Sequence, residues 1–185
     1  SFTAVFAADE TEKTPGEILE QIGVLKGNTE GDLMLDKEVS RRDMVVLLSR
    51  LLGQEDEAKN FSGDTTFKDV KDTTDPDYDS YYVSYIAWAQ ANKLTNGVDE
   101  SGEVFSPKRS QTEQEVLAYL LRALGYGFDE VKWEDVVAKA AELKLIDDAK
   151  ADYSKAATRE VLAKLSLQAL KTKVKDSDKT LAEKL

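Results

Sequence analysis

Three segments of the chain share one pattern, and this repetition constrains the fold more than any other sequence feature. Each segment begins with a serine or threonine and continues with apolar residues at helical spacing, over residues 40–52, 112–124 and 158–170. A hydroxyl side chain at such a start can accept a hydrogen bond from a free backbone N–H group of the helix. Apolar residues three and four positions apart then share one helical face. The pattern predicts three capped helices, each with one buried face.

The spacing within these segments supports the same interpretation. Ser40 with Asp43, and Thr112 with Glu115, have the spacing of a capping box, in which hydroxyl and acid satisfy backbone N–H groups reciprocally. Thr158 has no acid at that spacing. We expect six leucines of the three apolar faces to be buried in one shared core: Leu48, Leu52, Leu120, Leu124, Leu165 and Leu170.

A second apolar helical stretch and a turn-rich loop precede each capped helix. These stretches cover residues 17–25, 81–94 and 133–146. The unit of helix, loop and capped helix therefore occurs three times, and such repeats bury their faces against their neighbours. The capping residues at 40, 112 and 158 are 72 and then 46 positions apart, so the first linkage carries an insertion, most simply residues 54–79. Within it, residues 67–70 are expected to be a short extended segment.

The chain divides into five expected parts. They are a flexible tail over residues 1–14, three repeats over 15–60, 61–128 and 129–173, and a C-terminal linker over 174–185. Residues 1–8 are apolar with small residues at the end, and this is typical of the remnant of an export signal. A short N-terminal strand and a sequence added for expression are the alternatives. Export combined with the absence of cysteine favours a bacterial surface.

Composition excludes several classes of function. The 185 residues carry a formal net charge of -11, which argues against binding of nucleic acid or insertion at an anionic membrane. The chain has neither cysteine nor histidine, so thiol catalysis, histidine acid/base chemistry and zinc sites of the usual kind are absent. The longest apolar runs are too short to cross a bilayer. We therefore expect a mainly all-α protein without thiol- or histidine-dependent catalysis, and no cofactor or metal is predicted.

The middle unit carries five spaced elements in a fixed order. They are Phe67-Lys68-Asp69-Val70, the aromatic residues Tyr82, Tyr85 and Trp88, Leu94-Thr95-Asn96-Gly97, Phe105-Ser106-Pro107, and Thr112-Glu113-Gln114-Glu115. This order resembles the repeat of the S-layer homology (SLH) domain family. The first unit offers residues 23–27 and 40–43 to the same comparison, and the third offers 133–136 and 158–160. The resemblance covers about residues 15–173, but Glu113 stands where the family has arginine.

This resemblance implies a fold and a function. The fold would be a pseudo-threefold bundle of three helix-loop-helix repeats, with one central helix from each repeat and grooves between repeats. The function would be non-catalytic: such domains commonly attach exported proteins to the anionic secondary polysaccharide of the bacterial cell wall. The chain would then be part of a longer protein at the cell surface. The alternative is a structural surface-layer or protein-interaction module whose grooves no longer bind glycan, and the glutamate at 113 favours it for at least one groove.

Two arginines are candidates for binding an anion. Arg41 and Arg159 each follow a capping hydroxyl, where the helix N-terminus already carries partial positive charge and a further cation is unfavourable. A bound carboxylate or phosphate would compensate that charge, because free backbone N–H groups and a guanidinium together can hold an anion. The alternative is that each arginine pairs with a nearby acid or lies flat on the bundle.

Other polar and aromatic residues complete the candidate site. Arg42 lies beside Arg41, and Lys108 and Arg109 could supply positive charge just before the middle capped helix. Tyr82 is expected to be exposed, as is Tyr78, and sugar rings stack on exposed aromatic rings. By contrast, Tyr81, Tyr85 and Trp88 share one helical face and are expected to be a core stripe.

The acidic residues suggest two further hypotheses, which we consider weaker. Asp75, Asp77 and Asp79 begin like a calcium-binding loop, but Ser80 stands where glycine is needed and Ile86 where a bidentate glutamate is needed. A solvated acidic loop is therefore the expectation. A glycosidase with paired carboxylates is the other hypothesis, yet no pair of acids is singled out by its position.

Overall fold

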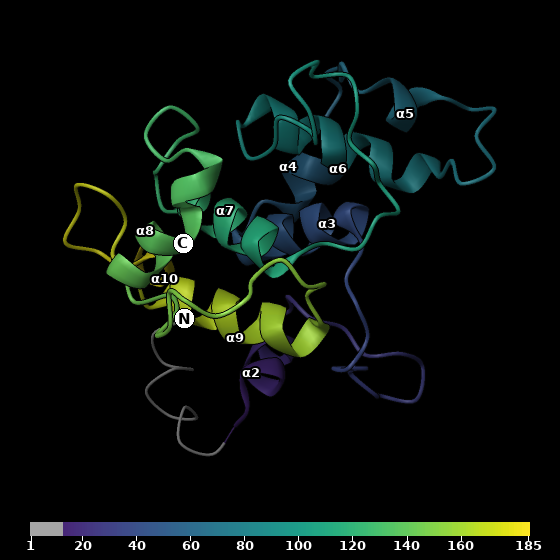
Figure 1. Ribbon diagram of the computed structural model, residues 1–185. Helices are drawn as coiled ribbons and strands as arrows, with labels where there is room; N and C mark the ends of the chain where they lie inside the picture. Colours follow the sequence, from purple (N-terminus) through teal and green to yellow (C-terminus); the bar gives the residue numbers. More distant parts are fainter. Residues whose placement is uncertain (1–12) are drawn as a thin grey trace. The chain divides into compact units, whose positions relative to one another are not determined.

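The computed structural model describes residues 13–185 and is built from helices, with no extended strand among those residues (Figure 1). The α-helices are α2 (Pro15–Gln21), α3 (Arg41–Leu51), α4 (Glu55–Lys59), α5 (Lys68–Lys71), α6 (Ser80–Ala91), α7 (Glu113–Ala123), α8 (Val136–Glu142), α9 (Arg159–Leu170) and α10 (Leu181–Lys184), and Trp133–Asp135 form a short 3-10 helix, η1. The prediction of an all-α fold is confirmed. In this part of the chain, no helix is both long enough and apolar enough to span a membrane.

The three capped helices begin directly after the predicted hydroxyl residues. The Ser40 side chain accepts from the Asp43 N–H at 3.2 Å, and Thr112 and Thr158 cap α7 and α9 in the same way. Around Thr112 the capping box is complete, because the Glu115 carboxylate accepts from the Thr112 N–H at 3.1 Å. The Asp43 carboxylate instead accepts from the Ser40 hydroxyl at 2.9 Å. Local sequence therefore determines where each of these helices starts.

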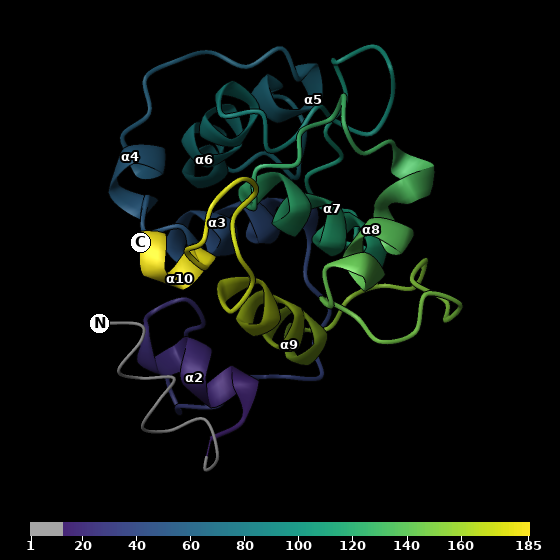
Figure 2. The ribbon, with the colours of Figure 1, turned by 90° about the vertical axis from the view of Figure 1, so that its left-hand side faces the viewer.

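The described chain forms two compact units. The continuous unit is residues 39–111, and the two-segment unit combines residues 13–38 with 112–185. In the continuous unit, α6 packs against α3 and α4, and α5 packs against α6. In the two-segment unit, α2 packs against α9, which also contacts α7 and α10, and α8 packs against α7 (Figures 1 and 2).

The boundaries of these two units do not coincide with those of the three predicted repeats. The first helix of each repeat packs against the capped helix of a different repeat: α2 against α9, α6 against α3, and α8 against α7. A long turn-rich loop separates each first helix from the capped helix of its own repeat, so its apolar face is buried on a neighbour instead. Each of these helix pairs therefore joins two different predicted repeats.

Five of the six predicted core leucines are buried, namely Leu48, Leu120, Leu124, Leu165 and Leu170. The prediction for Leu52 was wrong, because this residue is half-buried and Leu51 takes the core position, with 1% of its surface exposed. Leu52 follows the last turn of α3, at the position that Leu124 occupies after α7. Leu124 is fully buried there, and the C-terminal segment contacts the same helix end, where the Lys175 N–H donates to the Leu124 carbonyl at 2.9 Å. A single core shared by all three repeats stays a prediction.

Residues 67–70 form a helical turn rather than the expected extended segment, since α5 begins at Lys68. The turn brings the Asp69 carboxylate to the backbone of a distant loop. Asp69 accepts from the N–H of Phe105 at 3.0 Å and from the N–H of Ser106 at 2.7 Å. Ser106 has a positive φ of 57°. Asp69 therefore holds the loop that precedes the middle capped helix in a defined conformation.

The two ends of the chain differ from the expected tail and linker. Residues 1–12 lie outside the described residues, but Thr14 accepts from the Glu17 N–H at 3.3 Å and so caps α2. In the segment 174–185, Leu181 and Ala182 are buried, and α10 packs against α9 (Figure 2). The segment predicted as a linker thus contributes to the two-segment unit.

Candidate functional site

The backbone N–H groups that were expected to bind an anion are already occupied at the start of α3. The N–H of Arg41 donates to the carbonyl of Arg109, and the N–H of Arg42 donates to the carbonyl of Pro107, both at 2.9 Å. These carbonyls belong to the loop before the middle capped helix. The first two N–H groups of α3 therefore have protein partners, and the expectation that they are free was wrong.

The same arrangement occurs at the other two capped helices, in the two-segment unit. The donors and acceptors are Glu113 to Lys155 and Gln114 to Tyr153 at α7, and Arg159 to Lys37 and Glu160 to Leu35 at α9. Each accepting residue lies three or five positions before a capping hydroxyl. The loop that precedes one capped helix thus closes the start of another, and this contact recurs at all three helix starts.

The guanidinium groups of Arg41 and Arg159 also bind loop carbonyls. Arg41 donates from Nε to the Phe105 carbonyl at 2.7 Å, lies 4.8 Å from the centre of the Phe105 ring, and exposes only 3% of its surface. Arg159 is half-buried and donates to the carbonyls of Leu33 and Lys26, both at 2.9 Å. Carbonyl oxygens therefore offset the unfavourable position of a cation at a helix N-terminus.

Three of the predicted site residues lie together in the continuous unit. Arg42 on α3 and Tyr82 on α6 both line a small pocket, and Lys108 contacts Asp77 at its edge. We call this the Arg42 pocket; its other polar or aromatic lining residues are Asp69, Asp75, Asp77, Tyr78 and Asp79. Arg109 is exposed on the same loop as Lys108, and Arg159 belongs to the other unit.

Hydrogen bonds and a cation–π contact fix the side chains of the Arg42 pocket. The Arg42 guanidinium lies 4.5 Å from the centre of the Tyr82 ring and donates to the Asp77 carbonyl at 3.0 Å. Tyr82 donates its hydroxyl to Asp43 Oδ1 at 2.6 Å, and Lys108 Nζ lies 2.9 Å from Asp77 Oδ1. Burial, together with the Asp43 carboxylate, raises the pKa of the Tyr82 hydroxyl above its ordinary value. Tyr82 therefore remains a protonated donor at neutral pH.

The carboxylates around the Arg42 pocket hold the protein's own groups. Asp69 accepts from Phe105 and Ser106, Asp75 from the Asp77 N–H, Asp77 from Lys108, and Asp79 from the Tyr81 N–H. Among residues 13–185, no three acidic side chains are grouped so that they could hold a metal ion. The acidic side chains of this loop thus stabilise its conformation through hydrogen bonds within the protein.

Comparison with known proteins supports a relationship to bacterial surface proteins. No family model matches the chain. It is 26% identical over 151 residues to the Surface layer protein of Brevibacillus choshinensis, covering 76% of this chain and 13% of that protein. It is 28% identical over 130 residues to the Middle cell wall protein of Brevibacillus brevis (69% and 12%), and 30% identical over 156 residues to the Cell surface protein of Thermoanaerobacter kivui (82% and 19%).

The chain is related to bacterial surface proteins. These relatives confirm the predicted location at the cell surface, and their names are consistent with the resemblance to surface-layer domains. The chain spans less than a fifth of the length of each of them, between 12% and 19%.

The prediction of which aromatic side chains are exposed was wrong at two positions. Tyr82 was expected to be exposed and is half-buried. Tyr85 and Trp88 are buried as expected, but Tyr81 is 47% exposed on the first turn of α6. Trp133 was not singled out and is 52% exposed in the two-segment unit. In the comparison of residues 133–136 with 67–70, Trp133 corresponds to Phe67. Phe67 is fully buried, so this comparison did not indicate that Trp133 is exposed. Trp133 lies beside the start of α7, where the Gln114 side chain donates to its carbonyl at 2.9 Å.

Glu113 occupies the first position of α7, where α3 and α9 have arginine. Its side chain is buried, with 7% of the residue exposed, and burial raises the pKa of its carboxyl group. Lys155 Nζ, 4.0 Å from the carboxylate, opposes this shift, and Asp152 adds to it. The ionised form is therefore less favourable in the folded chain than in the unfolded one.

We expect Glu113→Gln to stabilise the protein at neutral pH. A carboxyl group whose pKa is raised in the folded state lowers the free energy of unfolding as the pH rises from the ordinary glutamate pKa to the raised one, and the penalty is in place above both. The variant should therefore melt at a higher temperature at pH 7 and show no advantage below the ordinary glutamate pKa. Thermal unfolding across this pH range measures the effect, with the exposed Glu160→Gln as control. A lower melting temperature of Glu113→Gln at pH 7 would show that the Lys155 pair outweighs burial.

Proposed function

We propose that the chain is a non-catalytic module that holds a surface protein at the bacterial cell wall by binding an anionic wall polysaccharide. The observation that carries this proposal is the Arg42 pocket, which is lined by a guanidinium group and two tyrosines and has the ammonium group of Lys108 at its edge. The relatives named as surface-layer, cell-wall and cell-surface proteins support the setting.

The pocket offers chemistry suited to an acidic sugar. Arg42 has five N–H donors, and the bond to the Asp77 carbonyl uses one of them. Lys108 adds a second positive charge at the edge, and Tyr78, which is 36% exposed, offers an aromatic face to a sugar ring. Several carboxylates surround these groups, so an anion must be bound locally by Arg42 and Lys108. Binding should weaken with salt, because these charges remain partly exposed.

The proposal includes the absence of catalysis. Glycoside hydrolysis needs two carboxyl groups placed on either side of the bond to be cleaved. The carboxylates of the Arg42 pocket accept hydrogen bonds from backbone N–H groups or pair with Lys108. We therefore expect purified wall polysaccharide to remain intact after prolonged incubation with the protein, measured by release of reducing ends.

One observation favours a structural or protein-interaction module instead. Glu113 places a buried carboxylate at the start of α7, and the arginines at the starts of α3 and α9 bind loop carbonyls. On this alternative, the helix starts hold the repeats together and no groove binds glycan. The alternative predicts that the wild-type chain does not bind wall polysaccharide.

Calorimetric titration with purified wall polysaccharide tests the proposal. Replacement of Arg42 by alanine removes a charge-assisted hydrogen bond and should lower affinity by roughly ten- to a hundredfold. Lys108→Ala should have a smaller effect in the same direction. Lys68→Ala, which removes an exposed lysine paired with Glu103 in the same unit, is the matched control.

Two results would contradict the proposal. Wild-type affinity in the Arg42→Ala, Lys108→Ala double variant would exclude the Arg42 pocket as the site. An absence of binding by the wild-type chain at low salt would favour the structural alternative.

A further inference from the structure

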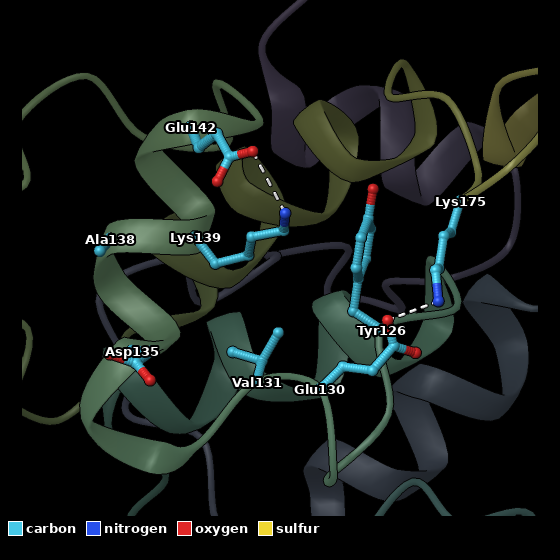
Figure 3. Close-up of a pocket in the computed structure, with 8 residues that line it drawn as sticks. All are labelled: Tyr126, Glu130, Val131, Asp135, Ala138, Lys139, Glu142 and Lys175. Atoms are coloured by element: carbon cyan, nitrogen blue, oxygen red, sulfur yellow. Dashed lines mark hydrogen bonds and ion pairs between the residues drawn. The ribbon is translucent and has the colours of Figure 1, made fainter.

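A second pocket, of about 370 Å³, lies entirely in the two-segment unit (Figure 3). Its volume is within the range of small-molecule sites, about 300–1,000 Å³. It lies between the loop after α7, the helix α8 and the C-terminal segment. We call it the Tyr126 pocket, and its principal lining residues are Tyr126, Glu130, Val131, Lys139, Glu142 and Lys175.

Two ion pairs line the Tyr126 pocket. Lys139 Nζ lies 3.2 Å from Glu142 Oε1, and Lys175 pairs with Glu130. Each ammonium group has three N–H donors, and each carboxylate has two oxygens that accept several hydrogen bonds. The pairs therefore leave donors and acceptors for a ligand without being broken. A ligand that both donates and accepts, as a hydroxyl group does, suits this lining.

An aromatic ring lies among these charges. Figure 3 shows the Tyr126 ring between the side chains of Lys139 and Lys175, and Lys139 Nζ lies 4.8 Å from the ring centre. Val131 and Ala138 add apolar surface. An aromatic ring and aliphatic groups beside paired donors and acceptors match a sugar ring, which has C–H faces and hydroxyl edges.

The charge balance narrows the class of ligand. The lining includes three carboxylates, Glu130, Asp135 and Glu142, against the two lysines, which leaves one net negative charge. The carboxylates would repel an anionic ligand, and the ammonium groups would repel a cationic one. We propose that the Tyr126 pocket binds an uncharged saccharide ring. This inference goes beyond the proposed function, because the pocket shares no residue with the Arg42 pocket and uses a different chemistry.

Comparison of α6 with α8 indicates why a pocket borders Lys139. After α6 and α8, Lys93 and Lys144 both have positive φ angles, 59° and 63°, and this sets the register between the two helices. In that register Lys139 corresponds to Trp88, five residues earlier in each case. Trp88 is 1% exposed in the continuous unit, where α4 packs against α6. Lys139 occupies this position on α8, and no short α-helix among the described residues packs against α8 as α4 packs against α6. The space beside Lys139 is therefore open.

The experiment is a titration of the full chain, followed by amide NMR, with N-acetylglucosamine and its β-1,4-linked disaccharide as uncharged probes. Shifts should concentrate in residues 126–142 and around Lys175. Lys139→Trp, which imitates Trp88, should fill the pocket and abolish these shifts. Tyr126→Ala should weaken binding by roughly two- to tenfold. Lys150→Trp, an exposed lysine outside the pocket, is the matched control, and circular dichroism confirms the folding of each variant.

The outcomes separate this inference from the proposed function. Shifts that disappear in Lys139→Trp but persist in Lys150→Trp and Arg42→Ala would support the Tyr126 pocket, whatever the wall polysaccharide does. Absence of shifts in this region at saturating probe, or unchanged binding in Lys139→Trp, would overturn the inference. Tighter binding of glucuronate than of the uncharged probes in this pocket would overturn the class of ligand.

Discussion

Replacement of Leu51 by alanine is expected to lower the free energy of unfolding by about 2–5 kcal/mol. Leu51 is 1% exposed on the last turn of α3, so truncation removes apolar contacts and leaves a cavity. The neighbouring Leu52→Ala is the matched control and should cost only a fraction of this, because Leu52 is half-buried. Urea unfolding of both variants measures the difference. Equal losses would contradict the assignment of Leu51 to the core.

The same unfolding experiment tests the prediction of one shared core. Each repeat contributes its first helix to the capped helix of another repeat, so the repeats should not unfold one by one. We expect a single transition in the wild type, with coincident signals from Trp88 in the continuous unit and Trp133 in the two-segment unit. Two separated transitions would show that the units unfold independently.

Replacement of Arg41 by alanine should reduce stability rather than affinity. The buried guanidinium donates to the Phe105 carbonyl at 2.7 Å, and hydrogen bonds to charged groups contribute about 1.5–3 kcal/mol. The adjacent Arg42→Ala should change stability little, because Arg42 is less buried and lines the candidate pocket. Denaturant unfolding and the polysaccharide titration, applied to both variants, compare the two roles.

A loss of glycan affinity without a loss of stability in Arg41→Ala would place Arg41 in the binding site. Wild-type stability of Arg41→Ala with reduced glycan affinity would support the original hypothesis of an anion bound at the start of α3. Reduced stability with retained affinity would establish that Arg41 positions the loop at Phe105.

Part of the candidate site could be predicted from sequence because its determinants are local. Arg42 and Tyr82 were candidates on charge and on helical position, and both line the same pocket. Lys108 was a candidate from its place before a capped helix. The partners of the helix-start backbone N–H groups and of the two guanidinium groups could not be predicted in this way, because they are distant in sequence. Arg41 and Phe105 are 64 residues apart, and Arg159 and Lys26 are 133 apart.

The sequence by itself determined the helical class and the starts of the three capped helices. A hydroxyl residue followed by apolar residues at helical spacing acts within one or two turns, so it needs no tertiary partner. Only the tertiary structure decided which loop closes which helix start, and which repeat covers the first helix of another. It also decided that Leu52 is half-exposed while Leu124 is covered, and that Lys139 borders a pocket where Trp88 is buried. Burial depends on the segments that pack over a residue, and here those segments lie far away along the chain.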